Sequence, residues 1–258
     1  RPPTRHGRAI RRVQMVRQQP RGGQFRDIGI RRSEINLRLG GRIRAPTLAD
    51  HPVLWSFRRC PYAMRARLAL NSAGIQVELR EILLRDKPGA FLETSPSGTV
   101  PCLKSGDRVI DESLDIMVWA LRQNDPDALL TMPEAAWDLI KDNDGPFKSA
   151  LDHTTYATRY PDLDLVAERA RAGDFLIRLQ DNLAEHPWVF GDRPSLADYA
   201  ILPFVRQFAF VDRAWFDAQP WPGVTAWLDR VLESPDFAAI MAKYPPWQDG
   251  QPPVWVGI

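Results

Sequence analysis

Apolar and polar residues follow two different rhythms along the chain from about residue 52 onwards. In the first half, short apolar or alternating runs are typical of strands, and stretches with apolar residues three and four apart are typical of helices. The predicted elements are a strand over 53–57, a helix from Pro61 to Gly74, a strand over 75–82, strands over 100–103 and 108–110, and a helix over 111–121. This order predicts a parallel β-α-β unit, then a hairpin and a covering helix.

Beyond this half the pattern is helical almost throughout. A long amphipathic helix is predicted over 164–186, an apolar helix over 191–210 and a pair of helices over 221–237. Ser195 lies three residues before Asp198, which is the spacing of a capping box. We therefore expect an α/β domain and an all-α domain with these boundaries: a leader 1–50, the α/β domain 51–125, a linker 126–132, the all-α domain 133–246 and a tail 247–258.

Charge separates the leader from the rest. Residues 1–44 contain 13 arginines against Asp27 and Glu34, a net charge of +11, whereas the whole chain carries +2. Such a segment, interrupted by Pro and Gly, cannot bury enough apolar surface to fold alone, so we expect it to be disordered. Three explanations stay open: a nucleic-acid-binding arm, an organellar presequence, or an upstream extension that is not part of the native protein.

Composition excludes several classes of protein. The chain has no apolar run of membrane-spanning length, which argues against a transmembrane protein. Two cysteines make no disulfide framework and suit a reducing compartment, so we expect a cytoplasmic protein. Four scattered histidines and the lack of a CxxC pair argue against a structural zinc site, and we expect no metal.

Cys60 is the strongest candidate for chemistry. It lies where a strand ends and a helix begins, and Ala63 occupies the place of the second cysteine of a CxxC motif. Helix N–H groups and a set of nearby arginines should lower its pKa; these are Arg58, Arg59, Arg65 and Arg67. A buried structural thiol is the alternative. A reactive thiol without a local partner can attack a disulfide and hold a mixed disulfide with a small thiol.

Other residues suggest a pocket for that small thiol. A cis Pro101 would leave the backbone of Val100 free to pair with an extended ligand, although a trans turn is the simpler alternative. Glu112 and Ser113, at a helix start, can hold an ammonium and a carboxylate, or Ser113 can simply cap the helix. Cys102 follows Pro101, and strand alternation directs its side chain into the core rather than toward catalysis.

These motifs resemble those of the glutathione transferases. "CPYA", "RDKPGAFLETSPSGTVPCL" and "IDESLDI" have the order and spacing of that family, most like its cysteine-type members, the omega class and bacterial relatives. "SLADYAI" resembles the start of a helix in the family's C-terminal domain, and the resemblance covers about residues 52–246. It implies an α/β thioredoxin-like N-terminal domain that binds glutathione, followed by an all-α helical bundle.

The resemblance also implies roles. Cys60 would bond to or activate the glutathione sulfur, and Lys87 would reach the glycyl carboxylate. Val100, beside cis Pro101, would pair with the cysteinyl backbone, while Glu112 and Ser113 would bind the γ-glutamyl end. Arg59 departs from the apolar residue that is common before this cysteine. The residues expected around the second substrate are Phe57, Tyr62, Phe147, Tyr156, Arg206 and Phe210.

The function implied is an enzyme that uses glutathione as co-substrate for thiol transfer or reduction. Deglutathionylation and reduction of dehydroascorbate-like acceptors fit a cysteine better than conjugation to electrophiles, which would be weak. The family resemblance also implies a homodimer. The alternative is a non-catalytic protein of the same fold that binds RNA polymerase, as the stringent starvation proteins do.

Overall fold

The computed structural model describes residues 51–257. The elements of the first half are β1 (Val53–Ser56), α1 (Pro61–Ser72), β2 (Val77–Glu81), α2 (Gly89–Thr94), β3 (Cys102–Ser105), β4 (Arg108–Ile110) and α3 (Ser113–Gln123). The predicted β-α-β and β-β-α order is confirmed, with α2 added in the connecting loop. The predictions for residues 1–50 lie outside the described residues.

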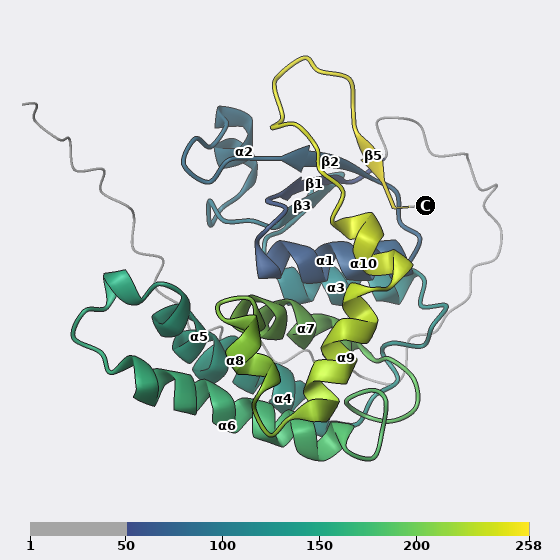
Figure 1. Ribbon diagram of the computed structural model, residues 1–258. Coiled ribbons are helices and arrows are strands. Elements are labelled where there is room, and N and C mark those ends of the chain that lie inside the picture. Colours follow the sequence, from purple (N-terminus) through teal and green to yellow (C-terminus); the bar gives the residue numbers. More distant parts are fainter. Residues whose placement is uncertain (1–50, 258) are drawn as a thin grey trace, which may run out of the picture. The chain divides into compact units, whose positions relative to one another are not determined.

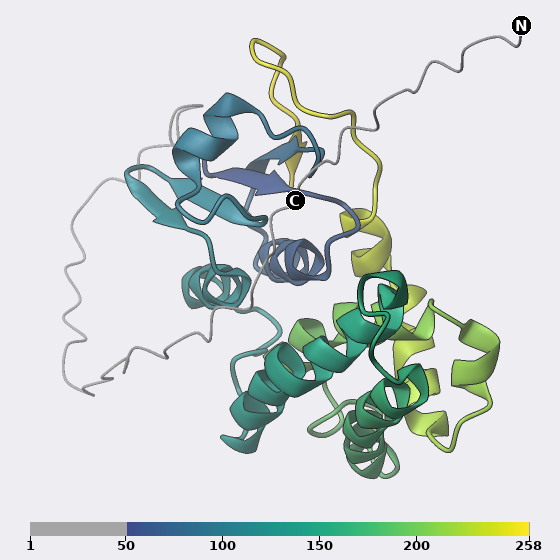
Figure 2. The ribbon, with the colours of Figure 1, turned by 90° about the vertical axis from the view of Figure 1, so that its left-hand side faces the viewer.

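The sheet of the first half has a thioredoxin-like layout. Its strand order is β4-β3-β1-β2-β5; β1 and β2 are parallel, and β3 runs antiparallel to β1. Helices α1 and α3 pack together on one face of the sheet, and α2 lies on the other (Figures 1 and 2). Gly74, just after α1, has a φ of 62°, a left-handed conformation that lets the chain turn back into β2.

The second half is helical. Its elements are α4 (Ala135–Asp142), the π-helical turn η2 (Asn143–Phe147), α5 (Lys148–Thr155), the short η3 (Ala157–Arg159), α6 (Leu165–Leu183), α7 (Leu196–Ala209), α8 (Arg213–Asp217), α9 (Pro222–Leu232) and α10 (Pro235–Ile240). Helix α7 packs directly on α1, so one apolar core runs from the sheet into the helices. No helix within residues 51–257 combines the length and the apolar character that a membrane span requires.

The capping box predicted at Ser195 is present and organises the helical half. The Asp198 carboxylate, fully buried, accepts hydrogen bonds from the backbone N–H and hydroxyl of Ser195, both at 2.8 Å. It also accepts from the Val189 N–H and the indole of Trp227, each at 2.9 Å. This carboxylate thus joins the start of α7 to the preceding loop and to α9.

The C-terminal segment, expected only as a tail, contributes a strand. β5 (Trp255–Val256) pairs antiparallel with β2, beside which it lies in Figure 1. Earlier in the segment, the Trp247 N–H donates to the carbonyl of Glu81 at 2.7 Å. The indole of Trp247 meets Trp55 edge-on at 5.0 Å, and the Arg80 guanidinium lies 4.8 and 4.9 Å from these two rings. The segment therefore covers an edge strand that would otherwise be unpaired.

Because the C-terminal segment covers β2, we expect substitutions in this segment to lower the stability of the fold. Trp247→Ala is expected to lower the free energy of unfolding by about 2 kcal/mol, because a half-buried indole leaves the Trp55 cluster. Trp137→Ala, at an indole that is 37% exposed on α4, is the control and should cost less than about 1 kcal/mol. Urea titration of both variants measures the difference; equal losses would show that the tail is only loosely attached.

Candidate functional site

Cys60 sits at the junction that the sequence predicted. It is the N-cap residue of α1, with extended backbone, and Pro61 occupies the first helical position, where a missing N–H costs nothing. The Cys60 N–H donates to the carbonyl of Phe57 at 2.9 Å, which closes a tight turn after β1. Its half-buried Sγ lies 3.8 Å from the carbonyl oxygen of Val100. Two candidates 40 residues apart in the sequence are therefore neighbours.

The low pKa that the sequence predicts for Cys60 is not found in the structure. Burial raises the pKa of the Cys60 thiol above its ordinary value of 9.0, and this effect exceeds the opposing ones. The N–H groups of Ala63 and Tyr62 and the charges of Arg67 and Lys148 lower it by less. The sequence identified the helix N-terminus correctly but not the loss of solvent around the sulfur.

Two buried charged residues hold the loop before Cys60. The Arg67 guanidinium donates to the hydroxyl of Ser56 at 3.1 Å and to the carbonyl of Arg58 at 2.7 Å. The Glu81 carboxylate accepts from the Arg58 N–H at 2.6 Å. Burial lowers the pKa of Arg67 to about 10 and raises that of Glu81. This bracing fixes the direction in which the chain enters α1.

The Val100–Pro101 peptide bond is cis, as the resemblance implied. Within residues 51–257 the Val100 N–H has no hydrogen-bond partner, so this edge of the backbone is available to a ligand. Lys87 lies close by, because its Nζ donates to the carbonyl of Gly98 at 2.9 Å. Residues predicted to bind one extended molecule are thus grouped on one side of Cys60.

Ser113 belongs to a hydrogen-bonded link between the two halves of the fold. Its Oγ accepts from Nε of Arg65 at 3.0 Å, and the two terminal nitrogens of Arg65 donate to the Asp144 carboxylate at 2.7 and 2.8 Å. The Arg65 side chain is only 2% exposed. Because Ser113 Oγ accepts from Arg65, its own hydrogen stays free to donate.

The alternative of simple capping by Ser113 is not observed. Glu112 is the N-cap residue of α3, and neither it nor Ser113 makes a side-chain capping bond. Glu112 as a residue is exposed, but its carboxylate is partly shielded from solvent, and this desolvation raises its pKa, with further contributions from Asp111 and Asp115. The first N–H groups of α3 and the Glu112 carboxylate thus remain open to a ligand that carries both a carboxylate and an ammonium group.

The residues predicted around the second substrate divide into several groups. Phe57 packs beside Cys60 on the Trp55 cluster, and Tyr62 packs edge-on against Phe204 at 4.8 Å. Phe147 was wrongly predicted: it is 1% exposed and stacks on Phe175 at 4.5 Å, inside the helical core.

The three others keep some exposure. Tyr156, at the end of α5, is 38% exposed and has the Arg159 guanidinium 4.3 Å from its ring. Arg206 and Phe210 lie together at the end of α7, with the guanidinium 4.9 Å from the ring centre. Their roles toward a substrate stay a prediction.

Three charged residues near the start of α1 are not predicted from the sequence: Lys148 acts on Cys60, and Asp144 and Asp152 act on Tyr62. Asp144, Lys148 and Asp152 are spaced by four from η2 along α5. Lys148 pairs with Asp152, and its Nζ lies 5.7 Å from the ring centre of Tyr62. Their four-residue spacing predicts that the three charges share one face of a helix, but it does not indicate which element that face packs against.

Cys102 is a structural thiol here. It is fully buried in the Trp55 cluster, and burial raises its pKa to about 11. This agrees with the expected inward direction of the side chain. Unlike the half-buried Cys60, Cys102 exposes no surface through which a disulfide in solution could reach its sulfur.

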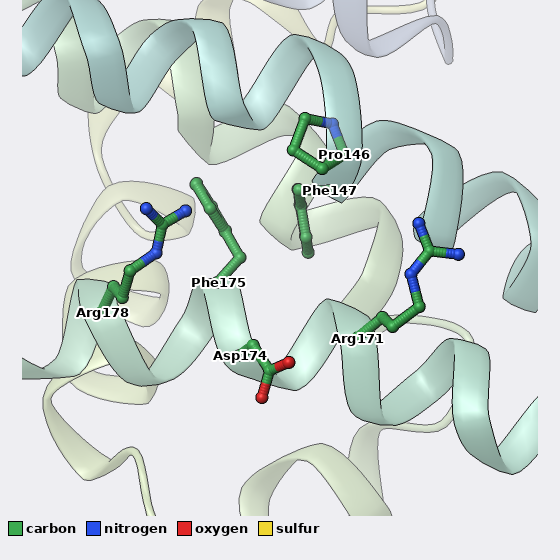
Figure 3. Close-up of a pocket in the computed structure, with 6 residues that line it drawn as sticks. All are labelled: Pro146, Phe147, Arg171, Asp174, Phe175 and Arg178. Carbon is green, nitrogen blue, oxygen red and sulfur yellow. The ribbon is translucent and has the colours of Figure 1, made fainter.

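A separate hollow of about 260 Å³ lies within the helical half, where Figure 3 shows the rings of Phe147 and Phe175 between two arginines. Arg171 pairs with Glu168, and Arg178 pairs with Asp142, so both cations are already neutralised. Cys60 does not line this hollow. Across residues 51–257, no cluster of His, Cys, Asp or Glu is arranged to hold a metal ion.

Comparisons with known proteins agree with this arrangement. The N-terminal domain model of glutathione S-transferase matches residues 54–128, and the C-terminal domain model matches residues 156–230. Glutathione S-transferase L3 of Arabidopsis thaliana is 27% identical over 202 residues, which cover 75% of this chain and 83% of that protein. Protein IN2-1 homolog A of Oryza sativa subsp. japonica is 31% identical over 185 residues, covering 69% of this chain and 68% of that protein.

Solved structures show the same fold. A glutathione transferase family member from Pseudomonas fluorescens pf-5, crystallised with two glutathione molecules bound, superposes with a TM-score of 0.64 at 17% identity. The match covers 76% of this chain and 94% of that one. Both domain models match in order, on the thioredoxin-like half and on the helical half, and the chain therefore belongs to the glutathione S-transferase family.

Proposed function

We propose that this protein is a cysteine-type glutathione transferase that catalyses glutathione-dependent thiol transfer through Cys60. The observation that carries this proposal is the place of the Cys60 sulfur: at the start of α1, half-buried, and 3.8 Å from the Val100 carbonyl. Tyrosine- or serine-dependent members of the family use a hydroxyl to stabilise a glutathione thiolate. A sulfur in that place can instead form a disulfide with glutathione.

Glutathione fits the groups beside Cys60 in one direction. The Glu112 carboxylate pairs with the γ-glutamyl ammonium, while the Ser113 hydroxyl and the first N–H groups of α3 take its carboxylate. The unpaired N–H of Val100 pairs with the cysteinyl residue, beside cis Pro101, and Lys87 takes the glycyl carboxylate. This placement brings the ligand sulfur next to Cys60, because Val100 touches both.

The reaction proceeds by two disulfide exchanges. The Cys60 thiolate attacks the glutathionyl sulfur of a mixed disulfide, the S–S bond breaks, and the second thiol leaves as a thiolate that takes a proton from solvent. A thiolate of a second glutathione then attacks the glutathionyl sulfur on Cys60, forming oxidised glutathione and restoring the Cys60 thiolate. No metal or other redox cofactor is needed. We further expect a homodimer, which the family resemblance implies, and a cytoplasmic location, which suits a chain with two cysteines.

The raised pKa of Cys60 predicts how the reaction depends on pH. Below its pKa the thiol is protonated and does not react, so each unit of pH below that value should reduce the thiolate fraction about tenfold. The rate of alkylation of Cys60 by iodoacetamide should therefore rise about tenfold per unit from about pH 6 to about pH 8.

Alkylation of the native protein followed by peptide mass spectrometry measures this rate for Cys60 separately from the buried Cys102. A plateau near neutral pH would contradict the prediction. It would show that the helix N-terminus, and not burial, dominates the ionisation of this thiol.

A further inference from the structure

Glu81 lies at a position of β2 where the alternation of the strand favours an apolar residue. Val77 and Leu79, which point to the same face of the sheet, are buried in the apolar core that α1 and α3 share with it, and Glu81 is only 9% exposed. Within residues 51–257 its Oε2 has no hydrogen-bond partner. A buried carboxylate with an unsatisfied oxygen costs stability, so its presence here indicates a role that an apolar side chain does not perform.

The Glu81 carboxylate acts on the turn before Cys60. Its Oε1 accepts from the backbone N–H of Arg58 at 2.6 Å, and the carbonyl of Arg58 accepts from the guanidinium of Arg67 at 2.7 Å. Both polar groups of this residue's backbone are thus held by buried charged side chains, one from β2 and one from α1. The Cys60 N–H closes the turn by donating to the carbonyl of Phe57 at 2.9 Å.

The position of this turn determines where the Cys60 sulfur lies. Its Sγ is 3.8 Å from the carbonyl oxygen of Val100, beside the backbone to which we propose that glutathione binds. Disulfide exchange requires a close and aligned approach of the sulfurs, and a misplacement of about 1 Å is enough to slow such a reaction about a hundredfold. A displaced turn should therefore slow exchange with glutathione more than reaction with a small reagent that needs no binding site.

The C-terminal segment, residues 247–257, binds Glu81 from the outer edge of the sheet. The Trp247 N–H donates to the Glu81 carbonyl at 2.7 Å, and the Leu79 N–H donates to the carbonyl of Val254 at 2.8 Å. Figure 1 shows this part of the chain, in yellow, running from α10 to β5 beside β2. The main chain of Glu81 is therefore held by the C-terminal segment, while its side chain holds the turn before the reactive sulfur.

Trp247 links the C-terminal segment to the site a second time. Its indole packs on the Trp55 cluster, and Phe57 and Cys60 pack on the same cluster. The segment lies outside residues 54–128 and 156–230, which match the two domain models of the family. It therefore adds contacts to the site that the matched regions do not contain.

We propose that Glu81 is a positioning residue for Cys60, and that the C-terminal segment, by docking on β2 through Trp247, keeps Glu81 in the place where it holds the turn. The segment thereby sets the rate at which the Cys60 sulfur exchanges with glutathione. This rests on the proposed function, since the rate concerned is that of disulfide exchange at Cys60. Glu81 and Trp247 take no part in the exchange; they act through the backbone of Arg58.

The test compares two reactions of the same sulfur. In one, the Cys60 thiolate attacks oxidised glutathione, the S–S bond breaks, one glutathione leaves as a thiolate and the other remains bonded to Cys60. In the other, iodoacetamide alkylates the thiolate without a binding site. Peptide mass spectrometry measures both rates at one pH, on protein that circular dichroism shows to be folded. Because both reactions need the thiolate, the ratio of exchange to alkylation cancels changes in its ionisation.

Glu81→Leu removes the acceptor of the Arg58 N–H and leaves an apolar side chain in an apolar environment. Its ratio of exchange to alkylation is expected to fall about tenfold or more, because the turn loses one of its two supports. Glu81→Gln keeps an acceptor oxygen with the same reach, and its ratio should stay within about threefold of wild type. This rescue separates positioning by a hydrogen bond from an effect of the negative charge.

Trp247→Ala tests the C-terminal segment, and it also serves if Glu81→Leu does not fold. Its ratio should fall about threefold to tenfold, since the Glu81 main chain loses a support. Trp255→Ala, in β5, is the matched control. Trp255 pairs with Glu78, and its ring meets that of His51 at 4.9 Å, so the substitution weakens the segment away from Glu81 and should leave the ratio unchanged.

The outcomes separate this proposal from the function on which it rests. A wild-type protein that is alkylated at Cys60 but not glutathionylated would overturn thiol transfer and, with it, the positioning role. A wild-type ratio in Glu81→Leu, or in Trp247→Ala if the first variant is unfolded, would overturn the positioning role and leave thiol transfer intact. Equal losses in Trp247→Ala and Trp255→Ala would show that the segment acts only on stability, which contradicts the proposal.

Discussion

Cys60→Ser is expected to reduce kcat/KM for glutathione-dependent reduction of a mixed disulfide by about three orders of magnitude or more. A serine hydroxyl ionises far less readily than a thiol, and among residues 51–257 no histidine or carboxylate is hydrogen-bonded to Cys60 to act as a base. A hydroxyl also cannot form the disulfide that the proposed exchange requires. The loss should therefore appear in kcat, with little change in the affinity for glutathione.

Cys102→Ser is the matched control. Cys102 lies fully buried in the Trp55 cluster and takes no part in the proposed exchange, so its replacement should lower stability while the folded protein keeps its rate. A coupled assay of thiol transfer measures the rate of each variant, and a calorimetric titration with glutathione measures its affinity for glutathione. Equal rates for wild type and Cys60→Ser would exclude the mechanism.

Arg65→Leu is expected to lower the free energy of unfolding by about 3 kcal/mol, because it breaks a buried, bidentate ion pair. The Asp144 carboxylate, 29% exposed, would lose its partner, and Ser113 would lose the donor that positions its hydroxyl. The same variant should weaken glutathione binding about tenfold while kcat at saturation changes little, since Arg65 positions Ser113 and does not touch the sulfur.

Two controls distinguish positioning from general destabilisation. Arg65→Lys keeps the charge but loses the paired hydrogen bonds, and should recover part of the stability and of the glutathione affinity. Arg178→Leu breaks the exposed pair with Asp142 and should cost less than about 1 kcal/mol, without an effect on glutathione binding. Equal losses of affinity in Arg65→Leu and Arg178→Leu would contradict a specific role for Arg65.

Much of the fold could be predicted from the sequence because its signals are local. The short apolar run around Trp55, the alternating run over 75–82 and the helical spacing of 164–186 depend on near neighbours, and the capping box at Ser195 needs only its own first turn. The site was predicted well where a motif fixes the backbone. Cys60 at a strand-to-helix junction and the cis peptide before Pro101 are examples.

The errors concern quantities that depend on distant parts of the chain. The pKa of Cys60 depends on how much solvent the surrounding fold removes from its sulfur, which no local pattern reports. The sequence places Arg65 among the positive charges near Cys60, but Asp144, 79 residues away, pairs with it and neutralises it. Phe147 is an aromatic residue of the kind that often lines a pocket, but its side chain is 1% exposed and packs in the helical core.

The C-terminal segment also has a feature that local sequence patterns do not predict. A strand of two residues, Trp255 and Val256, carries almost no periodic signal, and its pairing with β2 arises from the approach of the chain end to an uncovered edge. Sequence patterns can therefore indicate which residues are able to form a strand, while the partner that completes it is set by the tertiary fold.

The most direct test of this account is the mass of the protein after incubation with oxidised glutathione. We expect one glutathionyl group per chain, located on the peptide that contains Cys60 and removed by excess reduced glutathione. A protein that remains unmodified, or one that carries the group on Cys102, would contradict the proposal that the sulfur at the start of α1 exchanges disulfides with glutathione.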